Sequence, residues 1–92
     1  MKITLHYMGQ LRTVCGQSSE HVDVGEGASL WSVLRSRADH YGQAFSDIVL
    51  DDAGHPRPSI LVVVDDDLVD KRNDTPLSDG QAVRLLTAIA GG

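Results

Sequence analysis

Apolar and polar residues alternate at the start of the chain. In residues 2–8, KITLHYM, the side chains of Ile3, Leu5 and Tyr7 fall on one face, and mostly polar residues fall on the other. This period of two is typical of a strand with one buried face. Residues 21–24, HVDV, alternate in the same way after a glycine-containing turn. The two segments are therefore expected to form an antiparallel hairpin with a long loop.

The period then changes to that of a helix. Ser29 is placed to cap the N-terminus of a helix over residues 30–41, and Gly42 is placed to end it in a left-handed conformation. Residues 45–49 contain Phe, Ile and Val at spacings that predict a second, shorter helical piece. The apolar residues that recur at helical spacing in the longer helix are Leu30, Val33, Leu34, Ala38 and Tyr41.

The second half of the chain predicts three more strands. Residues 60–64, ILVVV, form a continuous apolar run that is typical of a central strand buried on both faces. Three aspartates at 65–67 end this run, and Leu68 and Val69 are expected to form a brief edge strand. A turn at 77–80 leads into a last strand at 82–86. In that strand Val83 and Leu85 are expected to face inward, and Arg84 and Leu86 outward.

This order of elements predicts an α+β fold of two layers. A hairpin, a crossover helix and further strands are consistent with a mixed sheet of four to five strands packed on one main helix. The right-handed crossover allows the first and last strands to lie together at the centre of the sheet. This arrangement is the β-grasp, or ubiquitin-like, fold. Residues 1–86 are expected to form one domain, and residues 87–92 an extended C-terminal tail.

Composition limits the classes of partner. The chain has 13 Asp and Glu against 8 Lys and Arg, a formal net charge of −5. This charge disfavours nucleic acid and anionic membranes as partners, and favours a protein partner with a basic face. The single Cys15 cannot form an internal disulfide, and the sequence shows neither a secretory signal nor a membrane-spanning run. A cytoplasmic location is expected.

Several side chains that could carry chemistry have simpler explanations. The run at residues 65–67 lacks the spacing of a calcium loop and is expected to be a solvated turn. The four histidines are scattered without cysteine partners, so no metal site is expected. Cys15 is expected to be a bystander thiol and Trp31 a partly buried packing residue.

The end of the chain carries the most specific pattern. The stretch LSDGQAVRLL at residues 77–86 is followed by six residues that finish in Gly91 and Gly92. Together with residues 9–12, GQLR, after the opening strand, it resembles the sulfur-carrier proteins of the MoaD and ThiS families. The resemblance covers essentially the whole chain. The length is nearer to the MoaD type, the small subunit of molybdopterin synthase.

The resemblance implies a chemistry for the diglycine. A ubiquitin-activating-type adenylyltransferase would use ATP to adenylate the carboxylate of Gly92, and a persulfide sulfur donor would then displace AMP to leave a thiocarboxylate. The chain itself would hold no permanent cofactor. Glycine at 91 and 92 suits this use because a Cβ atom would crowd the reacting carbonyl. The acceptor would be the large subunit of molybdopterin synthase or another sulfur acceptor enzyme.

The resemblance also implies a docking surface. Met8, Leu68 and Leu86 fall where MoaD-type proteins place apolar residues against their partners, and six extended residues from Thr87 would reach at most about 20 Å into a partner. Arg12 and Arg84 are candidates for contact with acidic groups of a partner, and the alternative is that they are solvated surface charges. The tail residues expected to contact the partner are Ala88, Ile89 and Ala90.

Two rival functions remain open. Within the same fold, the chain would be a carrier for cysteine, thiamine or another sulfur-containing metabolite, or a protein modifier that forms isopeptide bonds through Gly92. In a different class, it would be a non-catalytic β-grasp binding module that uses its sheet face and has an idle tail.

Overall fold

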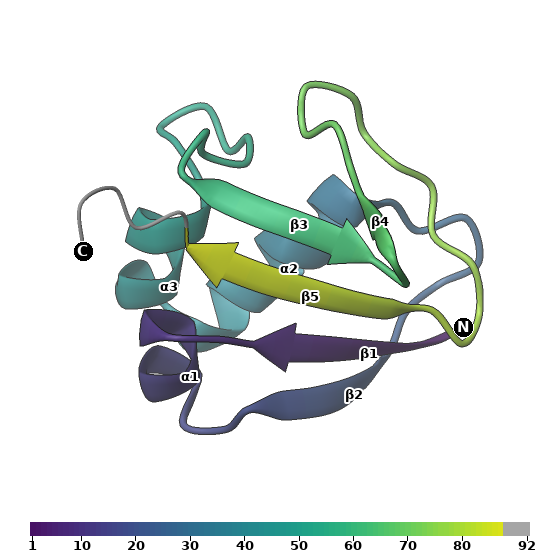
Figure 1. The fold of residues 1–92 in the computed structure, drawn as a ribbon, viewed down its shortest axis with the longest axis horizontal. Helices are drawn as coiled ribbons and strands as arrows, with labels where there is room; N and C mark the ends of the chain where they lie inside the picture. The colour runs from purple at the N-terminus through teal and green to yellow at the C-terminus, as the bar shows by residue number, and fades with distance from the viewer. Residues whose placement is uncertain (88–92) are drawn as a thin grey trace.

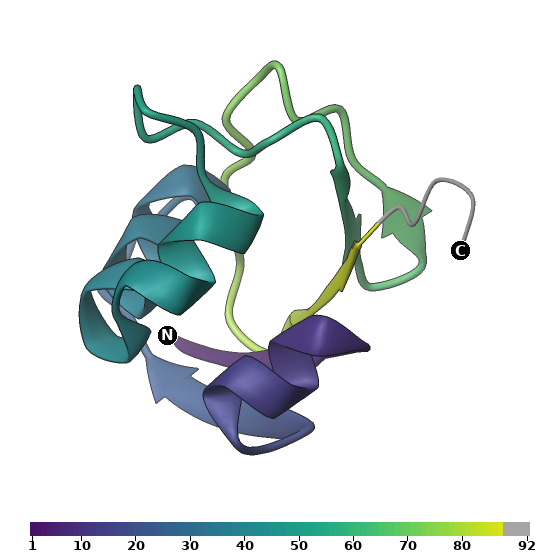
Figure 2. The same ribbon diagram turned by 90° about the vertical axis from the view of Figure 1, so that its left-hand side faces the viewer.

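The structure is a computed structural model that describes residues 1–87. Five strands form one sheet in the order β2-β1-β5-β3-β4, and helices lie against one face of it (Figures 1 and 2). This is the predicted β-grasp architecture. The elements are β1 (Lys2–Tyr7), α1 (Gln10–Cys15), β2 (Ser19–Asp23), α2 (Leu30–Tyr41), α3 (Gln43–Val49), β3 (Ile60–Val64), β4 (Asp67–Leu68) and β5 (Ala82–Thr87).

The first and last strands lie side by side at the sheet centre, as predicted. β1 and β5 pair in parallel, with Leu5 opposite Val83 and Tyr7 opposite Leu85. β2 pairs antiparallel with β1 on one side, and β3 pairs antiparallel with β5 on the other. The sheet therefore carries the C-terminal end of β5 between β1 and β3.

The inward face of the sheet forms the core with α2 and α3. The predicted inward residues Ile3, Leu5, Val83 and Leu85 are completely buried. In α2 the apolar stripe Leu30, Val33, Leu34 and Ala38 is also buried. The inward side chains of the strands and the apolar stripe of α2 therefore pack together in one core. Burial of these apolar side chains gives most of the driving force for folding.

Local signals at both ends of α2 act as predicted, with one difference. The Ser29 hydroxyl accepts a hydrogen bond from the Ser32 backbone N–H at 3.3 Å, and the Ser29 backbone N–H donates to the Ser32 hydroxyl at 3.0 Å. This reciprocal pair satisfies two backbone donors at the helix start. Gly42 ends the helix with a φ of +90°, but its ψ of −162° lies outside the left-handed helical region that was predicted.

Two predictions about elements are wrong. Residues 10–15 form helix α1, where a long hairpin loop was expected, so Cys15 ends a helix. β3 is next to the edge of the sheet and is not buried on both faces, because no helix covers its outer side (Figure 1). Leu61 of β3 is accordingly 37% exposed. The brief edge strand is confirmed one residue earlier, at Asp67–Leu68.

Candidate functional site

The C-terminal end of β5 defines where the tail starts. Thr87, the last described residue, lies opposite Ile60 of β3. On its other side, the Met8 backbone N–H donates to the Leu85 carbonyl oxygen at 3.2 Å. Gly9 lies so near that a Cβ atom on it would be 3.9 Å from the Thr87 hydroxyl oxygen. The tail therefore starts from a position fixed by both neighbouring strands and by the start of α1.

The predicted tail residues lie outside the described part of the chain. These are Ala88, Ile89, Ala90, Gly91 and Gly92.

Beside the start of the tail, the outer sheet face carries apolar side chains, which we call the outer apolar patch (Leu61, Val63, Leu68 and Leu86). Leu61 lies opposite Leu86 across β3 and β5, and Val63 lies opposite Leu68 across β3 and β4. Leu68 is 66% exposed. The structure thus brings two of the predicted docking residues, Leu68 and Leu86, onto one face. A contiguous exposed apolar patch is a feature of protein interaction sites.

Sequence reasoning missed Leu61 and Val63 as members of this patch. The β-branched run of β3 suggested burial on both faces, yet its burial alternates along the strand. The missing information was whether a second layer covers the outer face, and no single strand reveals that. One signal was available: a two-layer fold with a single main helix covers only one face of the sheet. From that expectation, Leu61 on the other face would have been predicted to be exposed.

A second feature of the outer face is a small hollow, which we call the basic notch after the basic side chains that line it (His6, Arg12 and Arg84). Arg84 of β5 lies opposite His6 of β1, and Arg12 projects from α1. The notch has a volume of about 250 Å³, and Met8, which is 44% exposed, is on its wall. All four predicted docking residues of the described chain therefore lie at the outer face, in two adjoining regions.

The acidic turn after β3 is a structured end to the strand. Asp65 has a φ of +55°, and its carboxylate accepts a hydrogen bond from the Ala82 backbone N–H at 3.1 Å and another from the Gln81 side chain at 3.2 Å. Its backbone carbonyl accepts a hydrogen bond from Arg84 Nη1 at 3.2 Å. This turn therefore ties β3 to the start of β5. Within residues 1–87, no group of three or more His, Cys, Asp or Glu side chains gathers as a metal site.

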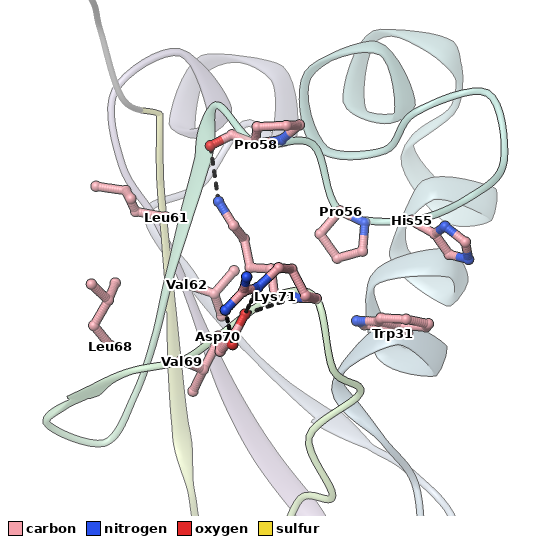
Figure 3. A pocket seen from close by; sticks show the side chains of 11 residues that line it. Trp31, His55, Pro56, Pro58, Leu61, Val62, Leu68, Val69, Asp70 and Lys71 are labelled. Carbon is pink, nitrogen blue, oxygen red and sulfur yellow. Dashed lines mark hydrogen bonds and ion pairs between the residues drawn. The ribbon is translucent and has the colours of Figure 1, made fainter.

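A larger pocket of about 680 Å³ lies at the β3–β4 edge (Figure 3). Trp31 and His55 form one wall, with ring centroids 4.8 Å apart, and Leu61 and Leu68 lie on the opposite side. The Lys71 ammonium donates to the backbone carbonyl of Pro58 at 2.9 Å and to that of Ile60. The pocket thus adjoins the outer apolar patch. Its lining offers no hydroxyl or thiol nucleophile beside a base, so it suits binding better than catalysis.

A partly buried polar cluster holds β2 against α2 on the other side of the molecule. The Glu20 carboxylate accepts hydrogen bonds from Arg37 Nη1 at 2.8 Å and from the Tyr41 hydroxyl and the Gln17 amide. Burial raises the pKa of the Glu20 carboxyl, but the hydrogen bonds from Tyr41 and Arg37 outweigh it, so this pKa lies below its ordinary value. Glu20 is therefore an ionised structural group at neutral pH.

The same surroundings make nearby acids poor nucleophiles. Burial first, and then the charge of Glu20, raise the pKa of the Cys15 thiol to about 11. Burial also raises the pKa of the Tyr7 hydroxyl above its ordinary value. Because the thiolate is the reactive form, Cys15 is a weakly reactive thiol at neutral pH.

Comparison with protein families identifies the chain. The sequence profile of the ThiS family matches residues 5–92, which is nearly the full length. The chain belongs to the ThiS family. The predicted resemblance to ubiquitin-like sulfur carriers is therefore confirmed. The match includes the diglycine at residues 91 and 92.

Solved structures agree on the fold. The HVO 2177 protein of Haloferax volcanii is 29% identical with a TM-score of 0.85, and the alignment covers 100% of this chain and 87% of that one. Urm1 of Trypanosoma brucei is 25% identical with a TM-score of 0.79, covering 99% and 95%. One chain from the complex of subunits 1 and 2 of the Helicobacter pylori molybdopterin-converting factor is 20% identical with a TM-score of 0.59. That alignment covers 100% of this chain and 100% of that one. A search of curated proteins gave no match. None of the described helices has the length and apolar character required to cross a membrane.

Proposed function

We propose that the protein is a sulfur carrier whose Gly92 carboxyl group is converted to a thiocarboxylate, and that it serves as the small subunit of molybdopterin synthase. The observation that carries this proposal is the family match, which continues through the diglycine to residue 92. The placement of the tail supports it. β5 directs Thr87 outward between β1 and β3, beside the outer apolar patch that a partner would cover.

The chemistry starts from a carboxylate that is a poor electrophile. A terminal carboxyl group is ionised at neutral pH, since its ordinary pKa is about 3.5. A Gly92 carboxylate oxygen would attack the α-phosphorus of ATP on the adenylyltransferase, and pyrophosphate would leave. The resulting acyl-adenylate has a good leaving group and an electrophilic carbonyl carbon, with no Cβ atom on the residue that carries it.

Sulfur would then enter in two steps. The terminal sulfur of the donor's persulfide attacks the carbonyl carbon, and AMP leaves with one carboxyl oxygen. A second thiol on the donor then attacks the donor cysteine's own sulfur in this acyl disulfide. The S–S bond breaks, the thiocarboxylate leaves with the outer sulfur, and the two donor cysteines remain as a disulfide. The acceptor enzyme then receives the sulfur. The carrier contributes reach and recognition to these steps, while its partners contribute the catalytic groups.

The test is an intact-mass measurement after incubation with the adenylyltransferase, ATP and a persulfide donor. We expect a mass gain equal to replacing one oxygen by one sulfur. Deletion of Gly92, or addition of one alanine after it, should abolish the gain, and Ala44→Gly on the exposed surface of α3 should not. If the full chain is neither adenylated nor gains this mass, the carrier function is wrong. If molybdopterin synthase is the acceptor, adding the large subunit together with its sulfur-accepting substrate should return the mass of the loaded chain to that of the carboxylate, and adding the large subunit alone should not.

A further inference from the structure

We propose that the partner binds through an acidic protein surface, whose carboxylates contact the guanidinium groups of Arg12 and Arg84 in the basic notch. This inference rests on the proposed function, since it describes the partner that handles the tail. It specifies the charge of that partner at a defined point, namely the base of the tail.

The notch lies against the start of the tail. Arg84 and His6 are opposite one another on the central strands β5 and β1, and Arg12 joins them from α1. Gly9, at the start of α1, lines the same notch and adjoins Thr87. A partner that grips the tail beyond Thr87 and extends back along β5 therefore covers the notch, and it reaches the Arg84 guanidinium where this group bonds the Asp65 carbonyl oxygen.

Both guanidinium groups are available to a partner. Within residues 1–87, the ion pairs are Arg37 with Glu20 and Arg72 with Asp70, and neither involves the notch. Arg84 uses one donor on the Asp65 backbone carbonyl, which leaves most of its five N–H donors free. Carboxylates of a partner can take these donors in charge-assisted hydrogen bonds.

The surroundings favour a protein over a nucleic acid. Met8 lines the notch and is 44% exposed, and Leu86 follows Arg84 on the outer face. The net charge of −5 repels a polyanion at long range, whereas a protein can pair carboxylates with the notch and cover the apolar side chains as well. The inferred partner charge is the reverse of the basic face expected from net charge alone, because net charge averages over the whole surface.

The experiment reverses charge inside and outside the notch. Arg84→Glu and Arg12→Glu are compared with Arg35→Glu, a matched control at an exposed position of α2, on the helical side of the sheet. Binding to the adenylyltransferase is measured at about 0.05 M and about 0.5 M salt, concentrations that differ strongly in screening. Each notch variant should bind at least about tenfold more weakly at low salt, while the control stays within about twofold. The affinity of the wild type should fall with salt more steeply than that of the notch variants.

Three further measurements separate the possible outcomes. Sulfur loading of the wild type by intact mass tests the proposed function by itself. If the wild type is loaded but charge reversal in the notch changes neither affinity nor salt dependence, the acidic-partner inference alone is wrong. If Arg84→Glu instead weakens binding of a labelled single-stranded oligonucleotide and leaves enzyme binding unchanged, the notch is a nucleic-acid site and the inference is overturned. Recovery of Arg84→Glu binding by an Asp→Lys change on the enzyme would establish the pairing.

Discussion

At the scale of single residues, the charged groups divide into a pair that fixes the fold and arginines that have no ion pair within residues 1–87. Glu20 and Arg37 have side chains only 12% and 20% exposed, and they pair with each other. Arg12 and Arg84 have no ion-pair partner within the described residues. The distinction matters because a paired, mostly buried charge contributes to stability, whereas an exposed one is available for binding.

Substitution of Glu20 by glutamine tests the structural group. The change keeps the size of the side chain but removes the charge that pairs with Arg37, so we expect a loss of about 1–3 kcal/mol of unfolding free energy at pH 7. Urea unfolding followed by the fluorescence of Trp31, the sole tryptophan, measures it. Arg72→Gln, which breaks the exposed pair with Asp70, is the control and should have little effect.

The pH dependence of this effect has a definite sign. The pKa of Glu20 in the folded chain is below its unfolded value of 4.5, so its stabilising contribution is present above that value. The contribution is lost as the pH falls through the folded pKa. The difference in stability between wild type and Glu20→Gln should therefore shrink as the pH falls below 4.5 and then through the folded pKa. A difference that stays constant over this range would contradict the assigned role.

At the scale of elements, sequence patterns identified long elements better than short ones. α2 has twelve residues, a buried stripe and a side-chain cap, and these features agree with one another. α1 has six residues, of which only Leu11 is buried, so it has too few turns to show a helical period. The outer exposure of β3 depends on what packs across the sheet, which the residues of the strand do not encode. The outward placement of Arg84 and Leu86 on β5 was predicted correctly because alternation fixes the outward side of a strand.

Substitution of Ser29 by alanine tests the cap of α2. It removes the hydroxyl that accepts a hydrogen bond from the Ser32 backbone N–H, so unfolding free energy should fall by about 1 kcal/mol. For a domain of this size, that corresponds to a Tm about 4–8 °C lower. Thermal unfolding followed by circular dichroism measures it. The matched control is Ser36→Ala within the same helix, where alanine has the better helix propensity and the Tm should stay level or rise. Equal losses in the two variants would show that the cap has no special role.

At the scale of the whole molecule, the two faces of the sheet have different surroundings, because helices cover one face and leave the other exposed. The inner face packs on α2 and α3 and contains the buried core (Figure 2). The outer face carries two features that meet at β5. The outer apolar patch extends from β5 toward β3 and β4, and the basic notch extends from β5 toward β1 and α1. A partner that covers this face therefore controls where the tail goes, and the folded body can contribute binding energy that offsets the entropy lost when the tail is ordered.

Substitution of Leu68 by aspartate separates folding from docking. Leu68 is 66% exposed, so the change should alter unfolding free energy by no more than about 0.5 kcal/mol. If the outer apolar patch is the centre of the interface, affinity for the partner should fall by about tenfold or more, because a desolvated carboxylate would replace an apolar contact. Ala44→Asp on the opposite, helical side introduces the same charge and should leave affinity unchanged. Both are measured by partner binding and urea unfolding on the same preparations. Equal affinities for the two variants would place the interface elsewhere, whereas weaker binding by Leu68→Asp alone, with stability retained, would locate it on the outer face beside the tail.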